Sequence, residues 1–363
     1  MSGPTESQIE SALREIIDPH TDQDPVKSKA VKHIAVDGGR VTVELQLGYP
    51  AKTWADQYAG MIRDKLEALP GVTEAVVKIG WEIVSHSVQK GVKPLPEVKN
   101  IIAVASGKGG VGKSTVAVNL ALALSADGAQ VGILDADIYG PSQPRMLGVR
   151  AKPESKDGKS MEPLHSYHLQ SMSIGFLIDE ETPMIWRGPM VTQALEQLLK
   201  DTRWSELDYL IIDLPPGTGD TQLTLAQRVP VSGAVIVTTP QDIALLDARK
   251  AYKMFEKVEI PILGVVENMS THICSQCGHE EHIFGEGGGQ RMAEEYGLNY
   301  LGAVPLDMQI RIDSDSGRPT VVADPDGAVA TTYRAIARRT AGKLATQRKD
   351  YSAKFPSIVI ESG

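Results

Sequence analysis

Residues 107–115, GKGGVGKST, have the types and spacing that bind nucleotide phosphates. They fit the pattern G-x-x-x-x-G-K-[ST] throughout. The glycines let the backbone curl until consecutive N–H groups converge on phosphate oxygens, and Lys113 can reach the β and γ oxygens. The hydroxyl of Ser114 can ligate Mg²⁺. We therefore expect a site for ATP and Mg²⁺ whose loop consists of Gly107, Lys108, Gly109, Gly110, Val111, Gly112, Lys113, Ser114 and Thr115.

A second lysine in this loop, Lys108, is not required by the phosphate-binding pattern. The simplest interpretation is a solvated loop lysine. However, K-G-G-x-G-K-[ST] resembles the deviant pattern of a group of P-loop proteins that typically pair as nucleotide-sandwich dimers. That resemblance implies a lysine that reaches the nucleotide of the opposite subunit, where a second cation offsets transition-state charge. We expect both Lys108 and Lys113 to be catalytic.

Three carboxylates follow apolar runs, in the stretches LDAD and IIDLPPG. A carboxylate at the end of an apolar strand beside the phosphate loop can hold Mg²⁺ through water, and Asp213 is our candidate for that role. Asp137 is the candidate to orient or activate the attacking water. Asp135 has a rival interpretation as a hydrogen-bonded strand-end residue, so the division of roles between Asp135 and Asp137 stays open. Gly217, in the turn PPGTGD, can offer a backbone N–H to the γ-phosphate.

The chain has only two cysteines, Cys274 and Cys277, spaced C-x-x-C. Thiolates at this spacing can bind a metal ion or an iron–sulfur cluster from one side, whereas clusters and closed zinc sites usually need four ligands. A homodimer that pools both cysteines of each chain on its two-fold axis would supply four thiolates. Alternatively, His279 and His282 complete a local zinc site. A redox pair and two inert thiols are the remaining interpretations.

Short apolar runs, rich in Val and Ile, alternate with polar or helical stretches after residue 100. Buried parallel strands have this composition, and the alternation predicts a doubly wound, mainly parallel α/β sheet. One run precedes the phosphate loop and a helix over residues 113–126 follows it, which is the context that a phosphate loop needs. The predicted strands are 101–105, 130–134, 209–212, 234–238, 262–266 and 300–304.

The first 90 residues follow a different pattern, with the predicted order α-β-β-α-β. Asp37-Gly38-Gly39 indicates a hairpin turn, and a helix over 54–69 has Met61 and Ile62 on its apolar face. We see no catalytic constellation in this small α+β domain. The domains that we expect are the α+β domain at 1–90, a linker at 91–100, the P-loop domain at 101–350 and a tail at 351–363.

Composition and charge restrict the partners of the chain. Its formal net charge of −9 argues against a sequence-independent grip on nucleic acid. No apolar run reaches the roughly 20 residues that span a bilayer, and no secretory signal is visible, so we expect a cytoplasmic protein with no membrane or nucleic-acid partner. The alternative is a positioning or partition ATPase that acts on membrane or DNA. The basic helix at 334–348 supports it, although its apolar residues are mostly alanines.

Taken in order, these motifs resemble those of the Mrp/ApbC-type iron–sulfur cluster carrier ATPases. The resemblance covers most of residues 100–325, and the first 90 residues resemble the small domain often fused ahead of this ATPase and found in other iron–sulfur assembly factors. Besides the phosphate loop and the cysteine pair, the matching motifs are LDADIYGPS at 134–142, IWRGPM at 185–190, DYLIIDLPPGTGD at 208–220, TTPQ at 238–241, ENMS at 267–270, IFGEGGG at 283–289, PLD at 305–307 and DSGRP at 315–319.

This resemblance implies a homodimer that binds a labile 4Fe-4S cluster through Cys274 and Cys277 of both chains. It implies transfer of the cluster to apoproteins with weak ATP hydrolysis, and cluster scaffold proteins are further candidate partners. Asn268 matches the position expected to contact adenine, whereas residues 186–189, WRGP, are a hallmark without an assigned role.

Two departures from the family pattern have different consequences. Ser275 replaces the proline that commonly follows the first cysteine, but both sulfurs remain. The N-terminal domain lacks the cysteine that often occurs near an A-C-P motif, because its residues 49–53 read YPAKT. We therefore expect that domain to be a docking or regulatory module without a cluster ligand.

Overall fold

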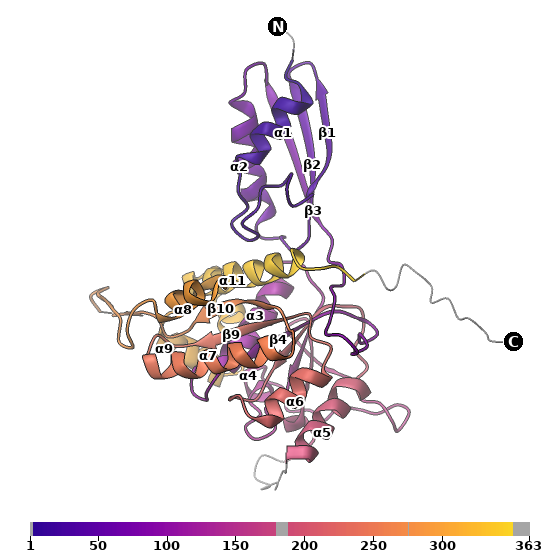
Figure 1. The fold of residues 1–363 in the computed structure, drawn as a ribbon, viewed down its shortest axis with the longest axis vertical. Helices are drawn as coiled ribbons and strands as arrows, with labels where there is room; N and C mark the ends of the chain where they lie inside the picture. The colour runs from indigo at the N-terminus through magenta and orange to yellow at the C-terminus, as the bar shows by residue number, and fades with distance from the viewer. Residues whose placement is uncertain (1–2, 179–187, 275, 351–363) are drawn as a thin grey trace, which may run out of the picture.

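The computed structural model describes residues 3–178, 188–274 and 276–350. Figure 1 shows a small N-terminal domain that stands on a larger α/β domain, with helix α11 (Ala328–Ala345) directly beneath it. The predicted tail at 351–363 lies outside the described residues.

The N-terminal domain has the predicted order of elements. Strands β1 and β2 form an antiparallel hairpin, and β3 pairs parallel to β2 with Glu74 opposite Arg40. Ile62 is buried as expected, but Met61 is 42% exposed, because it lies one helical step beside the buried stripe of α2. The elements are α1 (Glu6–Arg14), β1 (Val31–Asp37), β2 (Arg40–Leu47), α2 (Ala55–Glu67) and β3 (Glu74–Trp81).

The larger domain is built on an eight-stranded sheet with the order β13-β10-β9-β4-β8-β5-β7-β6. Every neighbouring pair is parallel except β6 with β7, so the predicted mainly parallel sheet is confirmed. All six predicted strands belong to it, and the short strands β6 and β7 were not predicted. Strand β4 starts at Val98, within the expected linker, because Val98 and Asn100 are buried. The strands are β4 (Val98–Ala105), β5 (Val131–Asp135), β6 (Leu164–Ser166), β7 (Leu169–Ser173), β8 (Leu207–Asp213), β9 (Gly233–Thr238), β10 (Ile262–Glu267) and β13 (Tyr300–Ala303).

Helices cover both faces of this sheet, and the central strand β4 contributes to a hydrophobic core on each face. Its residues Ile102 and Val104 belong to the core that contains α3, whereas Ile101 and Ala103 belong to the other one. Helix α3 is apolar around its whole circumference because it is buried on all sides. The helices are α3 (Lys113–Ala126), α4 (Gln143–Met146), η1 (Ile174–Phe176), α5 (Gly188–Asp201), α6 (Asp220–Arg228), α7 (Asp242–Lys257), α8 (Gly288–Tyr296), α9 (Met308–Asp315), α10 (Thr320–Ala323) and α11.

The basic C-terminal helix does not present all of its cations to solvent. Arg338 and Lys343 on α11 are both buried, and Lys343 forms an ion pair with Asp22 of the N-terminal domain. These two cations therefore join the domains, which leaves fewer charges of this helix for DNA or a membrane. No helix of the described chain combines the length and the apolar character that crossing a membrane requires.

Candidate functional site

The phosphate loop connects the end of β4 to the start of α3, as predicted. Gly110 and Gly112 have φ angles of 81° and 77°, which favour glycine. A Cβ atom at Gly112 would lie 2.1 Å from the Nδ2 atom of Asn268, so the close approach also requires glycine there. The loop thus delivers Lys113, Ser114 and Thr115 to the first turn of α3.

Lys113 lies in a buried polar cluster at the carboxyl ends of β4, β5 and β8. Its Nζ atom forms an ion pair with Asp213 and lies 3.2 Å from the Ser114 hydroxyl. The second carboxylate oxygen of Asp213 accepts a hydrogen bond of 2.9 Å from Gln143 Nε2. The lysine, the hydroxyl and the carboxylate that were singled out in the sequence are therefore in contact.

Asp135 and Asp137 occupy different environments beside this cluster. Asp135 is fully buried and accepts hydrogen bonds from the backbone of Asp137, Ser142 and Gln143 and from the Ser173 hydroxyl. Burial and the nearby Asp213 carboxylate raise the pKa of Asp135. This full set of partners fits the strand-end interpretation.

Asp137 is half-buried, and its carboxylate accepts a hydrogen bond of 3.3 Å from the Gly140 N–H. Burial raises the pKa of Asp137 as well, while Lys113 opposes that shift. Its less saturated carboxylate makes Asp137 the better of the two candidates to contact a water molecule, and this role stays a prediction.

Sequence reasoning missed Gln143 and Ser173 as parts of the site. Gln143 follows the quoted motif LDADIYGPS directly, and its amide bridges Asp213 to the Ser114 carbonyl oxygen. Ser173 ends the unpredicted strand β7 and reaches Asp135 across the sheet. The polar motif next to Gln143 was a usable signal, whereas Ser173 had none because the pairing of β7 with β5 was unknown.

Three other candidates have partners that the sequence did not show. Gly217 has a φ angle of 101°, and its N–H donates to the Ser106 carbonyl rather than remaining unpaired. Asn268 donates from Nδ2 to the Val111 carbonyl at 2.8 Å, so its amide supports the phosphate loop. Lys108 is half-buried, and its amine has no hydrogen-bond or ion-pair partner among the residues that the structure describes.

The two cysteines lie in a hairpin that follows β10. Strands β11 (His272–Ile273) and β12 (Glu280–Glu281) frame it, the Cys274 N–H donates to the His279 carbonyl and the Gly278 N–H donates to the Cys274 carbonyl, both at 2.9 Å. Gly278 has a φ angle of 71°, which closes the turn. Backbone N–H groups of Gln276 and Cys277 lower the pKa of Cys274 and thereby favour a thiolate.

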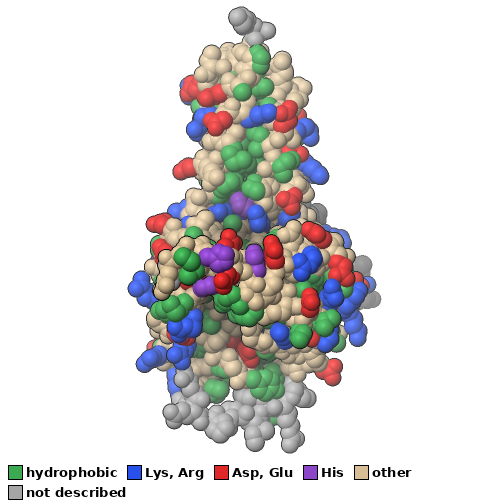
Figure 2. Space-filling model, turned by 90° about the vertical axis from the view of Figure 1, so that its left-hand side faces the viewer, with side chains coloured by type: hydrophobic (Ala, Val, Ile, Leu, Met, Phe, Trp, Pro, Cys, Tyr) green, Lys and Arg blue, Asp and Glu red, His purple; other side chains and the backbone are tan. Residues whose placement is uncertain are grey.

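Both thiols are free, and Cys277 is exposed while Cys274 is half-buried. Figure 2 shows histidine, acidic and hydrophobic side chains gathered on the face to the left in Figure 1, below the N-terminal domain. His279 lies 3.8 Å from Glu281, and His282 is within 3.3 Å of the Ser270 carbonyl. Across 3–178, 188–274 and 276–350, no three His, Cys, Asp or Glu side chains converge on a metal position.

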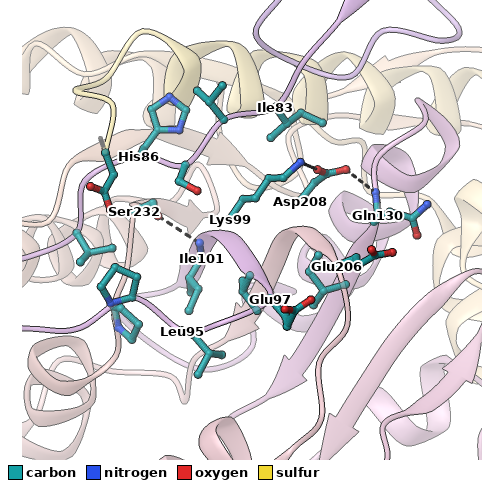
Figure 3. A pocket seen from close by; sticks show the side chains of 18 residues that line it. Ile83, His86, Leu95, Glu97, Lys99, Ile101, Gln130, Glu206, Asp208 and Ser232 are labelled. Atoms are coloured by element: carbon teal, nitrogen blue, oxygen red, sulfur yellow. Dashed lines mark hydrogen bonds and ion pairs between the residues drawn. The ribbon is translucent and has the colours of Figure 1, made fainter. Parts of the chain in front are cut away.

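A cavity of about 830 Å³ lies at the opposite, amino-terminal edge of the sheet. Figure 3 shows that Lys99, Asp208 and Gln130 line it and bond to one another. Lys99 Nζ lies 2.7 Å from the Asp208 carboxylate, and the Gln130 backbone N–H donates to the same carboxylate at 2.9 Å. Ligands of parallel α/β sheets bind outside the carboxyl ends of the strands. We therefore assign the nucleotide to the phosphate-loop edge and not to this cavity. Of the hallmark at 186–189, residues 186 and 187 lie outside the described residues, and α5 begins at Gly188.

Two family models match the chain. One, a NUBPL iron-transfer P-loop NTPase, matches residues 97–341, and the other, an iron-sulfur cluster assembly protein, matches residues 6–77. An iron-sulfur cluster carrier protein of Escherichia coli (strain K12) is 52% identical over 322 residues, which cover 87% of this chain and 86% of that protein. An iron-sulfur cluster carrier protein of Pseudomonas fragi is 57% identical over 279 residues, which cover 76% of this chain and 97% of that protein.

Among solved structures, a nucleotide-binding protein from Archaeoglobus fulgidus in complex with ADP is similar to the chain. Its sequence is 38% identical and its TM-score is 0.55, over 64% of this chain and 90% of that one. These relatives favour the carrier interpretation over the positioning or partition alternative. The chain belongs to the family of NUBPL iron-transfer P-loop NTPases.

Proposed function

We propose that this protein carries a labile 4Fe-4S cluster on Cys274 and Cys277 of two chains and transfers it to apoproteins, with binding and slow hydrolysis of ATP. The observation that carries the proposal is the cysteine hairpin, which holds two free thiols and no third ligand among the described residues. Clusters usually require four ligands, so one hairpin supplies half of a site. The names of the relatives support a cluster as the cargo.

A homodimer is the simplest source of the missing two thiolates, since a two-fold axis repeats the same pair. Exposed apolar side chains support this part of the proposal. Several follow the carboxyl ends of strands, at the same edge as the phosphate loop, and they include Tyr139, Ile243, Leu246, Met308 and Ile312. Exposed apolar side chains mark an interaction site where they adjoin, as Ile243 and Leu246 do one turn apart on α7.

At the nucleotide site, Ser114 and Asp213 are the residues that would hold Mg²⁺. Both contact the Lys113 amine, so their oxygens lie close together, and hydroxyl and carboxylate oxygens suit this cation. When the phosphates of ATP enter the loop, Lys113 exchanges its ion pair with Asp213 for the phosphate oxygens. The Asp213 carboxylate, released from Lys113, would then help to hold Mg²⁺, which would offset charge on the phosphates. Asp137 orients the attacking water, and Lys108 acts on the nucleotide of the other subunit.

Cluster transfer from anaerobically reconstituted protein to an apo-enzyme tests the central assignment. Cys277→Ala is expected to lose the broad visible absorption band and the transfer, while Gln276→Ala, in the same turn, keeps both. Normal transfer by Cys277→Ala, or bound zinc without a visible band in the wild type, would contradict the proposal.

Lys113→Ala addresses the part played by ATP in the same assay. Loss of transfer would make the nucleotide necessary for the handover, whereas normal transfer would make it regulatory. Because the two cysteines form no disulfide, we further propose a cytoplasmic location. Cluster scaffold proteins are the cluster donors that we propose.

A further inference from the structure

An aspartate at the C-terminal end of α3, the helix that follows the phosphate loop, is unfavourable for its immediate surroundings. Asp127 caps the C-terminus of α3 and is fully buried. The negative end of the helix dipole repels a carboxylate, and burial adds a desolvation cost. A glycine or asparagine would suit this position better, so the partners of Asp127 must explain it.

Those partners come largely from the N-terminal domain. One oxygen of Asp127 accepts a hydrogen bond of 3.0 Å from the Thr53 N–H and another from the Thr53 hydroxyl. The other oxygen lies 3.1 Å from Arg338 Nη1 on α11. In addition, the Lys52 N–H donates at 3.0 Å to the Asp127 carbonyl, one of the acceptors at a helix end that have no partner within the helix.

Arg338 extends the same network into the N-terminal domain. Its Nη1 atom donates to the Thr53 hydroxyl at 3.0 Å, and its Nε atom donates to His20 Nε2 at 3.3 Å. The guanidinium carbon lies 5.6 Å from the centre of the Trp54 ring. We name the set of Thr53, Asp127, Arg338 and His20 the interdomain joint.

The two domains are closely packed around the interdomain joint. A Cβ atom at Gly342 of α11 would lie 2.5 Å from the His20 carbonyl oxygen. A Cβ atom at Gly128 would lie 2.8 Å from the Trp81 ring. The N-terminal domain therefore sits directly on α11 and on the end of α3, as Figure 1 shows for α11.

We propose that Thr53, Asp127 and Arg338 are positioning residues of the ATPase, through which the N-terminal domain orients helix α3 and its phosphate loop. Helix α3 begins at Lys113 and has Asp127 as its C-cap, 14 residues later. Such a helix is about 21 Å long, so a tilt of about 3° at one end moves the other by about 1 Å. A displacement of that size is enough to weaken phosphate contacts strongly.

The coupling also operates in the opposite direction. If docking of the N-terminal domain raises the affinity for nucleotide, nucleotide must strengthen docking by the same factor. Nucleotide binding changes the contacts at the start of α3, because the ion pair between Lys113 and Asp213 has to give way to phosphate. The state of the nucleotide is then transmitted along α3 to the N-terminal domain.

Thr53→Val tests the proposal in the cluster-free full chain, independently of the proposed cargo. Valine has nearly the volume of threonine, so this variant removes the hydroxyl contact and keeps the backbone N–H contact to Asp127. We expect binding of ATP and ADP to weaken about 5-fold or more, with the unfolding temperature of the chain little changed. Thr73→Val, at another exposed threonine of the same domain, is the matched control and should bind as the wild type does.

A second variant and a second readout keep the test decisive. Arg338→Lys keeps a positive charge near Asp127 but loses the fork that reaches Thr53 and His20, and should weaken nucleotide binding in the same direction. ADP should protect the bond after the exposed Lys90, at the start of the linker, from trypsin in the wild type and protect it less in both variants. Unchanged affinity in both variants, or protection by ADP equal to that of the wild type, would overturn the proposal and leave the joint a purely structural contact.

Discussion

The two lysines of the phosphate loop have different roles in the isolated chain. Lys113 is buried and paired with Asp213, so it contributes to the folded state before any nucleotide binds. Removing one partner of a buried ion pair leaves an uncompensated charge. We therefore expect Lys113→Ala to abolish ATP hydrolysis and to lower the free energy of unfolding of the nucleotide-free protein by about 3 kcal/mol.

Lys108 provides the comparison. Its amine has no partner among the described residues, so Lys108→Ala should change the free energy of unfolding by about 0.5 kcal/mol or less while hydrolysis falls. Denaturant unfolding and ATP turnover, measured on both variants, separate the two effects. A stability loss of equal size in both would contradict the different environments of the two lysines.

Gly112 and Asn268 form a second residue-scale test. Gly112→Ala places a Cβ atom against Asn268 Nδ2 and forces alanine into a left-handed conformation, so nucleotide binding should be lost. Adding Asn268→Ala removes the clash but not the backbone strain of about 1 kcal/mol. Titration with ADP should show that Gly112→Ala costs less affinity in the Asn268→Ala background than in the wild-type background, and an equal cost in both would mean that the clash is not the cause.

At the residue scale, the sequence predicted what a contiguous motif contains. The loop residues, Asp213 and the cysteine pair were all recognisable because their neighbours along the chain define the chemistry. Gln143 and Asp127 were missed because their roles depend on partners distant in sequence. Asp127 in particular has no signal of its own, since its explanation lies 74 residues away in Thr53.

At the scale of elements, the docking of the N-terminal domain on α11 depends on a neutral histidine. His20 Nε2 accepts a hydrogen bond from Arg338, which a protonated ring cannot do at that atom. Burial lowers the pKa of His20 below 6.5, Arg338 and Arg339 act in the same direction, and Asp18 opposes them. Tyr49, the remaining titratable neighbour, keeps its proton because burial and Asp18 raise its pKa.

The sign of the resulting pH dependence follows from this lowered pKa. The unfolded chain takes up a proton on His20 below about pH 6.5 and the folded chain does not, so the stabilisation is complete above that pH. It falls as the pH decreases, by at most about 1.4 kcal/mol per pH unit. Unfolding midpoints between pH 5 and 7.5 should show a shallower decline in His20→Gln than in the wild type. His86, which is also buried with a lowered pKa, is present in both proteins and does not affect the difference.

Strands that are buried on both faces were easier to predict from the sequence than the other elements. Strands of the central sheet are continuous apolar runs because both of their faces are covered, and all six were found. Strand β7, LQSMS, carries serines that bond to Asp135 and to the Leu164 carbonyl, so it has no apolar signature. Met61 was expected inside because its type fits a core, and only the rotation of α2 against the sheet places it outside.

At the scale of the whole molecule, the proposed homodimer should depend on apolar contacts at the phosphate-loop edge. Ile243 is 70% exposed and Leu246 is 54% exposed at the start of α7. The next residue, Asp247, approaches the loop so closely that a Cβ atom at Gly107 would lie 2.0 Å from its carbonyl group. The two apolar residues therefore lie beside the phosphate loop, at the edge where a second subunit would bring its Lys108.

Replacing both residues by lysine should separate the functions of the dimer from those of the single chain. In the monomer these side chains are solvated, so the free energy of unfolding should change little. Light scattering should show a monomer where the wild type with ATP is a dimer, and ATP turnover should fall because Lys108 no longer acts in trans. The visible absorption of the reconstituted cluster should also be lost, because a single chain supplies only two thiolates. A monomer that still holds a full cluster would show that the hairpin obtains its other ligands elsewhere, and the pooled four-thiolate site would then be wrong.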